Sequence, residues 1–229
     1  MTDIPEALLG APLIANLGDE ERDQLLAAAS RRTVSKGQFL FHEGDPAEGL
    51  FVLAGGCMKL VRFTPQGKEL LLHLVHPGQT FAEAALFGRR TYPASSVAVA
   101  SSEVWVWPRP RLVQLLKGSP ELALALVLSV SVWTRHLVGK LELLTQRRVE
   151  ERLAVYLLGH VHGQPLPTGA SVELTETKSL IAAQLGTAPE VLSRTFRQLE
   201  EDGVLSVSGN RVEILDGDRF AVLAEPIEV

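Results

Sequence analysis

The chain has 229 residues, which is enough for two domains that each bury a hydrophobic core. Its hydrophobic content of 46% and charged content of 21% are those of a soluble globular protein and exclude extensive disorder. The formal net charge is −5, so the chain is no general polycation, and any contact with nucleic acid must come from a local surface.

The ends of the chain and its cysteine content indicate a cellular compartment. The segment Met1–Glu6 has no basic region and no apolar run after it, so we predict no signal peptide. The longest uncharged apolar run, Leu122–Thr134, is too short to cross a bilayer. Cys57 is the only cysteine, which excludes an intrachain disulfide and any iron–sulfur or zinc site held by several thiolates. We therefore expect a cytoplasmic protein with no membrane partner.

The first predicted element is a short amphipathic helix over residues 12–30. Leu17, Leu25 and Leu26 supply its apolar positions, and the acidic run Asp19–Glu21 lies near its start, where the helix dipole favours negative charge.

From Val34 to about Pro108 the pattern is that of many short strands. Turn signals rich in glycine and proline separate them. The predicted strands include Phe39–Phe41, Leu50–Leu53, Lys59–Phe63 and Glu69–Val75. Regularly spaced short strands are typical of an antiparallel barrel or jelly roll, so we predict an N-terminal β-roll within an α+β protein.

From about Pro110 to Gln146 the period becomes helical. Apolar residues at steps of three and four form a seam, which consists of Val130, Trp133, Leu137, Leu141 and Leu144. A second apolar stripe lies partly off that seam, at Leu126, Val127, Val132 and Val138. Two stripes on one helix fit a helix that packs on its own β-roll and on a second copy of the chain. The alternative is a buried helix in a monomer.

Beyond Gln146 the segments are short and mixed. We predict a helix over Arg147–Val161, a loop over Gly163–Gly169, two helices around Gly186, and a hairpin with strands Val204–Ser208 and Arg211–Leu215. The domain prediction is a β-roll sensor over 1–117, a dimerisation helix over 118–146, and a third domain over 147–229.

Two short helices around Gly186, followed by a hairpin, predict a winged helix-turn-helix. Thr177 is placed to cap the first helix, and Gly186 to end it in the left-handed conformation. Thr187 and Glu190, three residues apart, predict a capping box at the start of the second helix. The buried face of that helix is predicted to be Leu192, Phe196 and Leu199.

The opposite face of the second helix has the chemistry of a recognition helix. Arginine can bond guanine bidentately, glutamate can accept from cytosine, and hydroxyls can reach base edges or phosphates. On an isolated helix the same residues would be ordinary caps and solvated charges. Within this frame, the predicted DNA-contacting residues are Lys178, Thr187, Glu190, Ser193, Arg194, Arg197 and Arg211, of which Lys178 and Arg211 are phosphate contacts.

From about Leu13 to Leu215 the chain resembles the cyclic-AMP receptor protein/fumarate-nitrate regulator (CRP/FNR) superfamily. The matching stretches are Lys36–Asp45, Leu50–Leu53, Gly56–Leu60 and an effector-loop motif at Pro77–Phe87. This resemblance implies a cyclic-nucleotide-binding-like β-roll and a homodimer that binds a near-palindromic double-stranded DNA site and regulates RNA polymerase.

Within that superfamily the recognition motif is similar to the fumarate-nitrate regulator subgroup. The motif is Glu190-x-x-Ser193-Arg194, and Pro189 stands where the cyclic-AMP receptor pattern has arginine. The resemblance implies TTGAT-like half-sites, with Glu190 and Arg194 as the main base readers.

The resemblance also locates an effector pocket, which consists of Glu83, Ala84, Ser95, Ser96 and Leu137. Cyclic-AMP binders hold the phosphate with an Arg-Ser pair, for which this chain has Pro93 and Ala94. Without the guanidinium, the phosphodiester loses its bidentate counter-charge. Leu137-Val138 also stands in place of the Thr-Ser pair that contacts adenine, so both ends of the ligand site disfavour cyclic AMP.

Two hypotheses about the effector follow. Phe81–Ala84 with Tyr92-Pro93 resembles the dissimilatory nitrate-respiration branch, whose members are linked to haem and nitric oxide. The candidate axial ligands are His42, His73, His76, His136, His160 and His162, although the usual role of such a histidine is structural. The second hypothesis is that no effector is needed. A single cysteine excludes the iron–sulfur cluster of the fumarate-nitrate regulator.

The main alternative from another class is a ligand-binding β-roll protein or a cupin-like metal enzyme with structural C-terminal helices. Cupin-like enzymes need clustered histidine and carboxylate ligands, and the i, i+3 pair His73 and His76 does not form that pattern. We find no Ser/His/Asp set and no glycine-rich phosphate loop. The sequence therefore predicts a DNA-binding regulator that is no enzyme and has no dedicated metal site.

Overall fold

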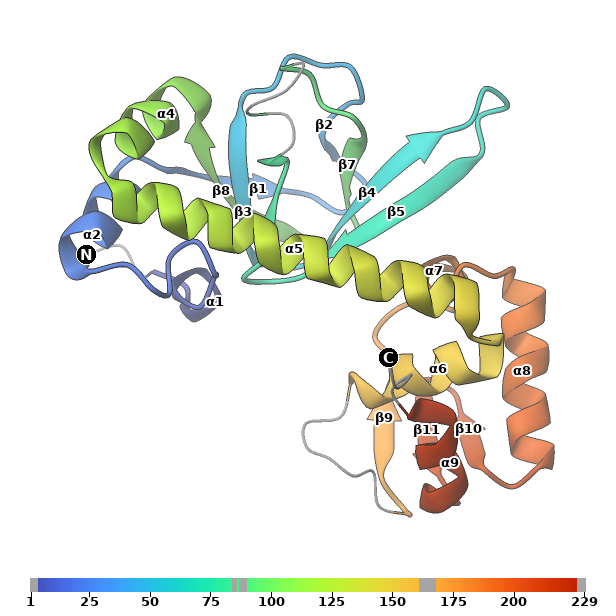
Figure 1. Cartoon of the computed structure of the whole chain (residues 1–229). Coiled ribbons are helices and arrows are strands. Elements are labelled where there is room, and N and C mark those ends of the chain that lie inside the picture. The colour runs from blue at the N-terminus through green and yellow to red at the C-terminus, as the bar shows by residue number, and fades with distance from the viewer. Residues whose placement is uncertain (1–3, 84–85, 87–89, 161–167, 226–229) are drawn as a thin grey trace. The chain divides into compact units, whose positions relative to one another are not determined.

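The computed structural model describes residues 4–83, 86, 90–160 and 168–225 (Figure 1). The chain forms two compact units, Met1–His136 and Leu137–Val229. The division lies inside one long helix, α5 (Pro120–Gln146), so the last turns of this helix belong to the second unit.

The first unit contains two antiparallel four-stranded sheets, which confirms the predicted β-roll. The strand orders are β1-β8-β3-β6 and β2-β7-β4-β5. The strands are β1 (Ser30–Val34), β2 (Phe39–Phe41), β3 (Gly49–Gly55), β4 (Met58–Phe63), β5 (Glu69–Val75), β6 (Thr80–Phe81), β7 (Ser95–Ala98) and β8 (Ser102–Pro108). Strands from distant parts of the sequence pair in both sheets, because β1 pairs with β8 and β2 with β7.

Aromatic rings fill the space inside the roll. The rings of Phe41 and Tyr92 stack with their centroids 3.7 Å apart, and those of Phe51 and Phe81 stack at 5.2 Å. All four side chains are buried. The Tyr92 hydroxyl has a hydrogen-bond partner in the core, because its oxygen accepts a hydrogen bond of 2.9 Å from the backbone N–H of Glu48. Stacked rings of this kind contribute beyond the apolar area they bury.

Helices cover the other side of the first sheet. They are α1 (Glu6–Leu9), α2 (Asp19–Ala27), α4 (Arg109–Gly118) and the first turns of α5. The prediction of one helix over 12–30 is wrong at both ends. Gly18 is extended and begins α2, and Ser30 already pairs with β8. Pairing with β8 outweighs local helical periodicity here, and the Trp107 indole N–H of β8 donates to the Leu25 carbonyl at 2.7 Å.

The helix α5 is apolar on two sides. The side that packs on its own roll is buried and consists of Leu122, Ala125, Leu126 and Ser129. Large apolar side chains on other sides are exposed, namely Leu124, Val127, Leu128, Val130, Val132, Leu137, Val138, Leu141 and Leu144.

The expectation that this apolar segment is too short for a bilayer needs correction. The uncharged run ends at Thr134, but the helix continues past Arg135, Lys140 and Glu142 to Gln146. By length and composition it could cross a membrane, and only 22% of its most apolar window is buried within the chain. Length and composition are weak evidence for a span, since a helix buried in a protein interface has the same composition.

The second unit packs four helices and a small sheet around one core. Its elements are α6 (Val149–Leu158), β9 (Ser171–Glu173), α7 (Lys178–Gln184), α8 (Pro189–Glu201), β10 (Leu205–Ser208), β11 (Arg211–Ile214) and α9 (Gly217–Ala224). The predicted helix pair and hairpin are confirmed. The sequence did not predict β9, which pairs with β11 to complete a three-stranded sheet, or α9. The described part of the predicted 147–161 helix is shorter, and residues 161–167 lie outside the described residues.

A substitution at Gly56, in the turn between β3 and β4, can test how closely the roll is packed. Its φ is +85°, and a Cβ atom there would lie 2.4 Å from the Ser101 carbonyl oxygen and 2.7 Å from the Ser102 Cα. We predict that Gly56→Ala destabilises the protein by about 3 kcal/mol, from backbone strain and overpacking together. Gly67→Ala is the control, since Gly67 has φ +77° and an added Cβ would meet no atom within 4 Å. Denaturant unfolding of both variants measures the difference, and equal losses would contradict the packing argument.

Candidate nucleic-acid interface

The helix α7 begins and ends as the sequence predicts. Its N-cap is Thr177, whose hydroxyl oxygen accepts a hydrogen bond of 3.3 Å from the backbone N–H of Leu180. After the C-cap, Gly186 has φ +61°, which is the left-handed conformation that a glycine adopts without strain. These two residues fix the length of α7 and the position of the turn that leads to α8.

The predicted capping box between Thr187 and Glu190 is wrong. The N-cap of α8 is Ala188, which makes no side-chain cap, and the helix begins at Pro189. A proline lacks an N–H and is favoured at the first helical position, so it sets the start one residue later than expected. The Thr187 backbone N–H instead donates to the Ala182 carbonyl at 2.9 Å and closes α7. Glu190 lies in the first turn of α8, where its charge suits the helix dipole.

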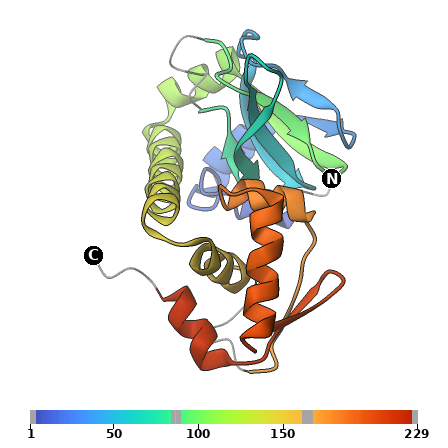
Figure 2. The ribbon, with the colours of Figure 1, turned by 90° about the vertical axis from the view of Figure 1, so that its right-hand side faces the viewer.

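The helix α8 has one buried face and one polar face. The buried face consists of Leu192, Phe196 and Leu199, as predicted. The exposed face contains Glu190, Ser193, Arg194 and Arg197. Figures 1 and 2 agree in showing α8 at the edge of its unit with the β10–β11 hairpin beside it, so this polar face is directed to the outside. This arrangement is that of a winged helix-turn-helix with its second helix free to enter a groove.

The hydrogen-bond donors on the exposed face are largely unused. Within the described part of the chain, neither Arg194 nor Arg197 makes an ion pair or a hydrogen bond through its guanidinium group. The Ser193 hydroxyl donates to the Pro189 carbonyl at 2.9 Å, so it keeps only its lone pairs for an outside partner. The two arginines therefore offer their full donor forks to a ligand such as guanine or phosphate.

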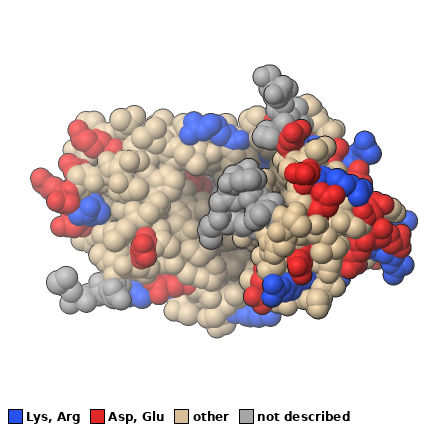
Figure 3. Space-filling view, turned by 90° about the horizontal axis from the view of Figure 1, so that it is seen from below, with Lys and Arg blue, Asp and Glu red and all other residues tan. Residues whose placement is uncertain are grey.

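The two predicted phosphate contacts lie on different elements. Lys178, in the first turn of α7, is exposed and places its ammonium group 5.7 Å from the centre of the Phe196 ring. Arg211 is exposed on β11, paired with Ser208 across the hairpin. Figure 3 shows acidic and basic side chains interspersed on the face that it presents, in keeping with the negative net charge.

The predicted seam of α5 contains four exposed aliphatic side chains and one half-buried tryptophan. The side chains of Val130, Leu137, Leu141 and Leu144 are between 37% and 63% exposed. Trp133 is half-buried and lies edge-on against His73 of its own β-roll, with ring centroids 4.3 Å apart. The structure therefore gives Trp133 a partner within its own chain.

In the effector region the structure connects Glu83 to the long helix. The Thr80 hydroxyl donates to the Glu83 carboxylate, and the Thr80 and Ser129 hydroxyl oxygens lie 2.9 Å apart. An ionised carboxylate only accepts, so Ser129 must donate to Thr80 while Glu83 is charged. Desolvation raises the pKa of Glu83. The sequence did not point to Thr80 or to Ser129, although a serine at a buried helical spacing was a usable signal.

The other predicted effector residues are separate from this chain of hydrogen bonds. The Ser95 hydroxyl oxygen accepts a 2.9 Å hydrogen bond from the backbone N–H of Glu43. The Ser96 hydroxyl is buried and has no hydrogen-bond partner among the described residues. Ala84 lies outside the described residues, and Leu137 belongs to the second compact unit.

The described histidines whose ring contacts are known lie in three separate places, although His73 and His136 are close to each other, with ring centroids 5.3 Å apart. His73 and His136 both lie beside Trp133, His42 stacks on Phe39, and His160 lies against Tyr156. His162 lies outside the described residues. No group of three or more histidine, cysteine or acidic side chains in the described ranges is arranged to hold a metal ion.

Two family models match the chain, and each covers one of the regions described above. A cyclic nucleotide-binding domain matches residues 31–119, and a Crp-like helix-turn-helix domain matches residues 151–223. A β-roll joined by a long helix to a winged helix-turn-helix defines a DNA-binding transcription regulator rather than an enzyme.

Relatives that match over nearly their whole length identify the family of this chain. The chain is 31% identical to the cyclic AMP receptor protein of Thermus thermophilus over 95% of its own length and 97% of the relative's. It is 32% identical to a crystal structure from Ruegeria pomeroyi, provisionally named a cyclic nucleotide binding protein, with 96% of each chain covered and a TM-score of 0.66. It is 29% identical to the structure of DNR from Pseudomonas aeruginosa, with 95% and 96% covered and a TM-score of 0.52. The chain belongs to the CRP/FNR family of transcription regulators.

Glu83 gives a test of the hydrogen-bonded chain. Its raised pKa means that the folded state holds the proton more tightly than the unfolded state, where a glutamate titrates near pH 4.3. Stability from this group is therefore present at low pH and is lost as the pH rises through the folded-state pKa. We predict that Glu83→Gln, which stays neutral, gains stability relative to the wild type as the pH rises above about 4.5.

Thermal unfolding at several pH values measures this gain. Glu20→Gln, on the exposed face of α2, is the matched control and removes the same charge from the surface. A difference in Tm between Glu83→Gln and the wild type that does not change with pH would refute the argument.

Proposed function

We propose that the chain acts as a homodimer that reads a near-palindromic, TTGAT-like DNA site through α8. The observation that supports base reading most directly is the exposed face of that helix. Arg194 can bond guanine through two parallel donors, and Glu190 can accept from cytosine. Arg197, Lys178 and Arg211 would then contact phosphates on either side. The match of Glu190, Ser193 and Arg194 to the fumarate-nitrate regulator subgroup is the basis for the proposed half-site.

We also propose that the exposed stripe of α5 is covered by a second copy of the chain rather than by lipid. Val130, Leu137, Leu141 and Leu144 recur at steps of seven, four and three residues, which is the spacing of a coiled-coil seam. A regulator that must reach DNA works in the cytoplasm, and a two-fold dimer would present two copies of α8 to two half-sites about 34 Å apart. RNA polymerase is the partner that the family membership suggests.

We infer that cyclic AMP is not the effector. Pro93 and Ala94 stand where cyclic-AMP binders carry the arginine and serine that hold the phosphate. Glu83, which could bond a ribose hydroxyl, already has a protein partner in Thr80. Haem and the absence of any effector are the two hypotheses that we carry forward. A visible spectrum of protein purified after haem supplementation distinguishes them, since a Soret band that shifts with nitric oxide supports haem and a flat spectrum opposes it.

The base-reading assignment is tested at Arg194. We predict that Arg194→Ala weakens binding to the specific duplex by about 1–3 kcal/mol and leaves binding to unrelated duplex much less affected. Arg22→Ala, which removes the same charge from α2 of the other unit, is the control and should leave specific binding unchanged. Titrations at fixed salt measure both constants. Unaltered specific affinity in Arg194→Ala would show that another residue reads the site.

The seam is tested at Leu137. We predict that Leu137→Glu raises the dimer dissociation constant by about 30-fold or more, because an unpaired charge would have to be buried between two helices. Val222→Glu is the control, because Val222 is 68% exposed on α9, away from α5 in the sequence. Sedimentation over a concentration range measures the oligomeric state. A Leu137→Glu protein that is as dimeric as the wild type would exclude this seam.

A further inference from the structure

The last turn of α5 lies against the turn of the helix-turn-helix. Both segments belong to the second compact unit, which begins at Leu137. A Cβ atom added to Gly186 would lie 2.7 Å from the Cδ2 atom of Leu144. Since Gly186 has φ +61° and no side chain, it allows Leu144 to approach the turn between α7 and α8 closely. The end of the helix that carries the predicted dimer seam therefore contacts the segment that sets the direction of α8.

Arg152 of α6 holds the same turn from a second direction. Its Nη1 atom donates a 2.6 Å hydrogen bond to the carbonyl of Leu185, the residue that ends α7. The same Nη1 atom would lie 3.4 Å from a Cβ atom on Gly186. The Arg152 Nε atom is buried and has no acceptor among the described residues. Burying part of a guanidinium group with one donor unused costs free energy that an apolar side chain would not cost.

We propose that Leu144 and Arg152 are positioning residues for DNA binding. Leu144 holds the turn before α8 against the last turn of α5, and Arg152 holds the same turn to α6, the helix that follows α5. The orientation of the recognition helix then follows the seam at Leu137 and Leu141, one or two turns earlier on the same rigid helix. The proposal rests on the proposed function, because it concerns how a dimer presents its two recognition helices. It assigns to Leu144 a contact with its own chain besides its place in the seam.

A positioning role for Leu144 and Arg152 predicts a change in DNA binding that a purely structural role would not cause. A palindromic site requires two copies of α8 at a fixed separation and angle. If the connection between α5 and the turn loosens, each recognition helix can still enter a groove, but the two helices no longer fit both half-sites at once. Affinity for the complete site should then fall more than affinity for a single half-site, by loss of effective concentration.

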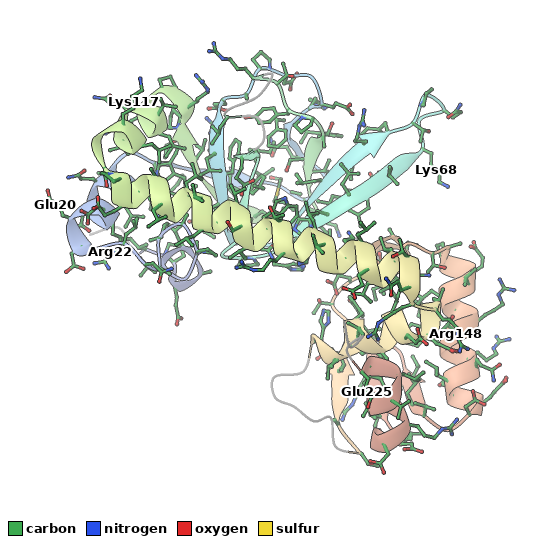
Figure 4. The ribbon with its side chains drawn as sticks, viewed as in Figure 1. Glu20, Arg22, Lys68, Lys117, Arg148 and Glu225 are labelled. Carbon is green, nitrogen blue, oxygen red and sulfur yellow. The ribbon has the colours of Figure 1, made fainter. Side chains whose placement is uncertain are left out.

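The experiment compares two duplexes at fixed salt and at protein concentrations where the dimer is intact. One duplex carries two inverted TTGAT half-sites with centres about 34 Å apart, and the other carries the same sequence with one half-site scrambled. The variants are Arg152→Ala, Arg152→Lys, which keeps a donor, and Leu144→Ala. Arg148→Ala is the matched control, because Arg148 is the N-cap residue before α6 (Figure 4) and its side chain pairs only with Glu150 and Glu151 among the described residues.

A second control separates the two roles of Leu144. Leu141→Ala alters the seam one turn earlier, at a side chain that is 63% exposed. It should weaken dimerisation without changing the ratio of full-site to half-site affinity once the dimer is saturated. Leu144→Ala should lower that ratio even in the saturated dimer.

We expect Arg152→Ala and Leu144→Ala to lower full-site affinity by about tenfold and half-site affinity by less than about twofold. Arg152→Lys should restore most of the full-site affinity, and Arg148→Ala should match the wild type. Equal losses on both duplexes, or no loss on either, would overturn the inference. A wild-type protein that does not prefer the palindromic duplex would instead refute the proposed function. If Arg152→Ala does not fold, Arg152→Lys and Leu144→Ala decide the question.

Discussion

The structure depends on the two-sided apolar character of α5. One stripe, from Leu122 to Ser129, is buried against the β-roll and its neighbouring helices. Another stripe, through Leu137 and Leu141, stays exposed within the single chain. A helix that is apolar on two sides gains free energy by burying both, and the described residues of this chain cover only one of them. The need for a second apolar surface is the physical basis for expecting a dimer, and it makes α5 the element shared by both compact units.

The DNA-binding chemistry is local and works against the overall charge. The chain has 27 acidic and 22 basic residues, so long-range attraction to DNA is weak. Arg194 and Arg197 lie on one exposed helix face and have no counter-ion among the described residues, which is why we propose that they contact DNA. The acid in that face, Glu190, weakens the attraction to phosphate, and the helix dipole offsets part of its charge; the proposed contact with cytosine would give it a role at a base edge.

The sensor unit is built on a chain of hydroxyl and carboxyl groups at the roll–helix contact. Thr80 joins Glu83 to Ser129, so a residue that the family resemblance assigns to a ligand is already engaged by the protein. On the other sheet of the roll, the buried Ser96 hydroxyl has no partner in the described ranges. A buried polar group without a partner costs free energy, so Ser96 contributes less to the stability of the roll than the hydrogen-bonded Ser95 does.

Local patterns in the sequence determined the element types. Alternation and turn residues gave the strands, three- and four-residue steps gave α5 and the faces of α8, and Thr177 and Gly186 gave the bounds of α7. Only the tertiary structure decided which strands pair. The start of β1 at Ser30, which pairs with β8, was therefore not predictable, and neither was the pairing of β9 with β11. The same holds for Thr80 with Ser129 and for Arg152 with the Leu185 carbonyl, 33 residues apart. Such contacts depend on how distant segments pack against each other, and the spacing of residues along the chain does not predict that packing.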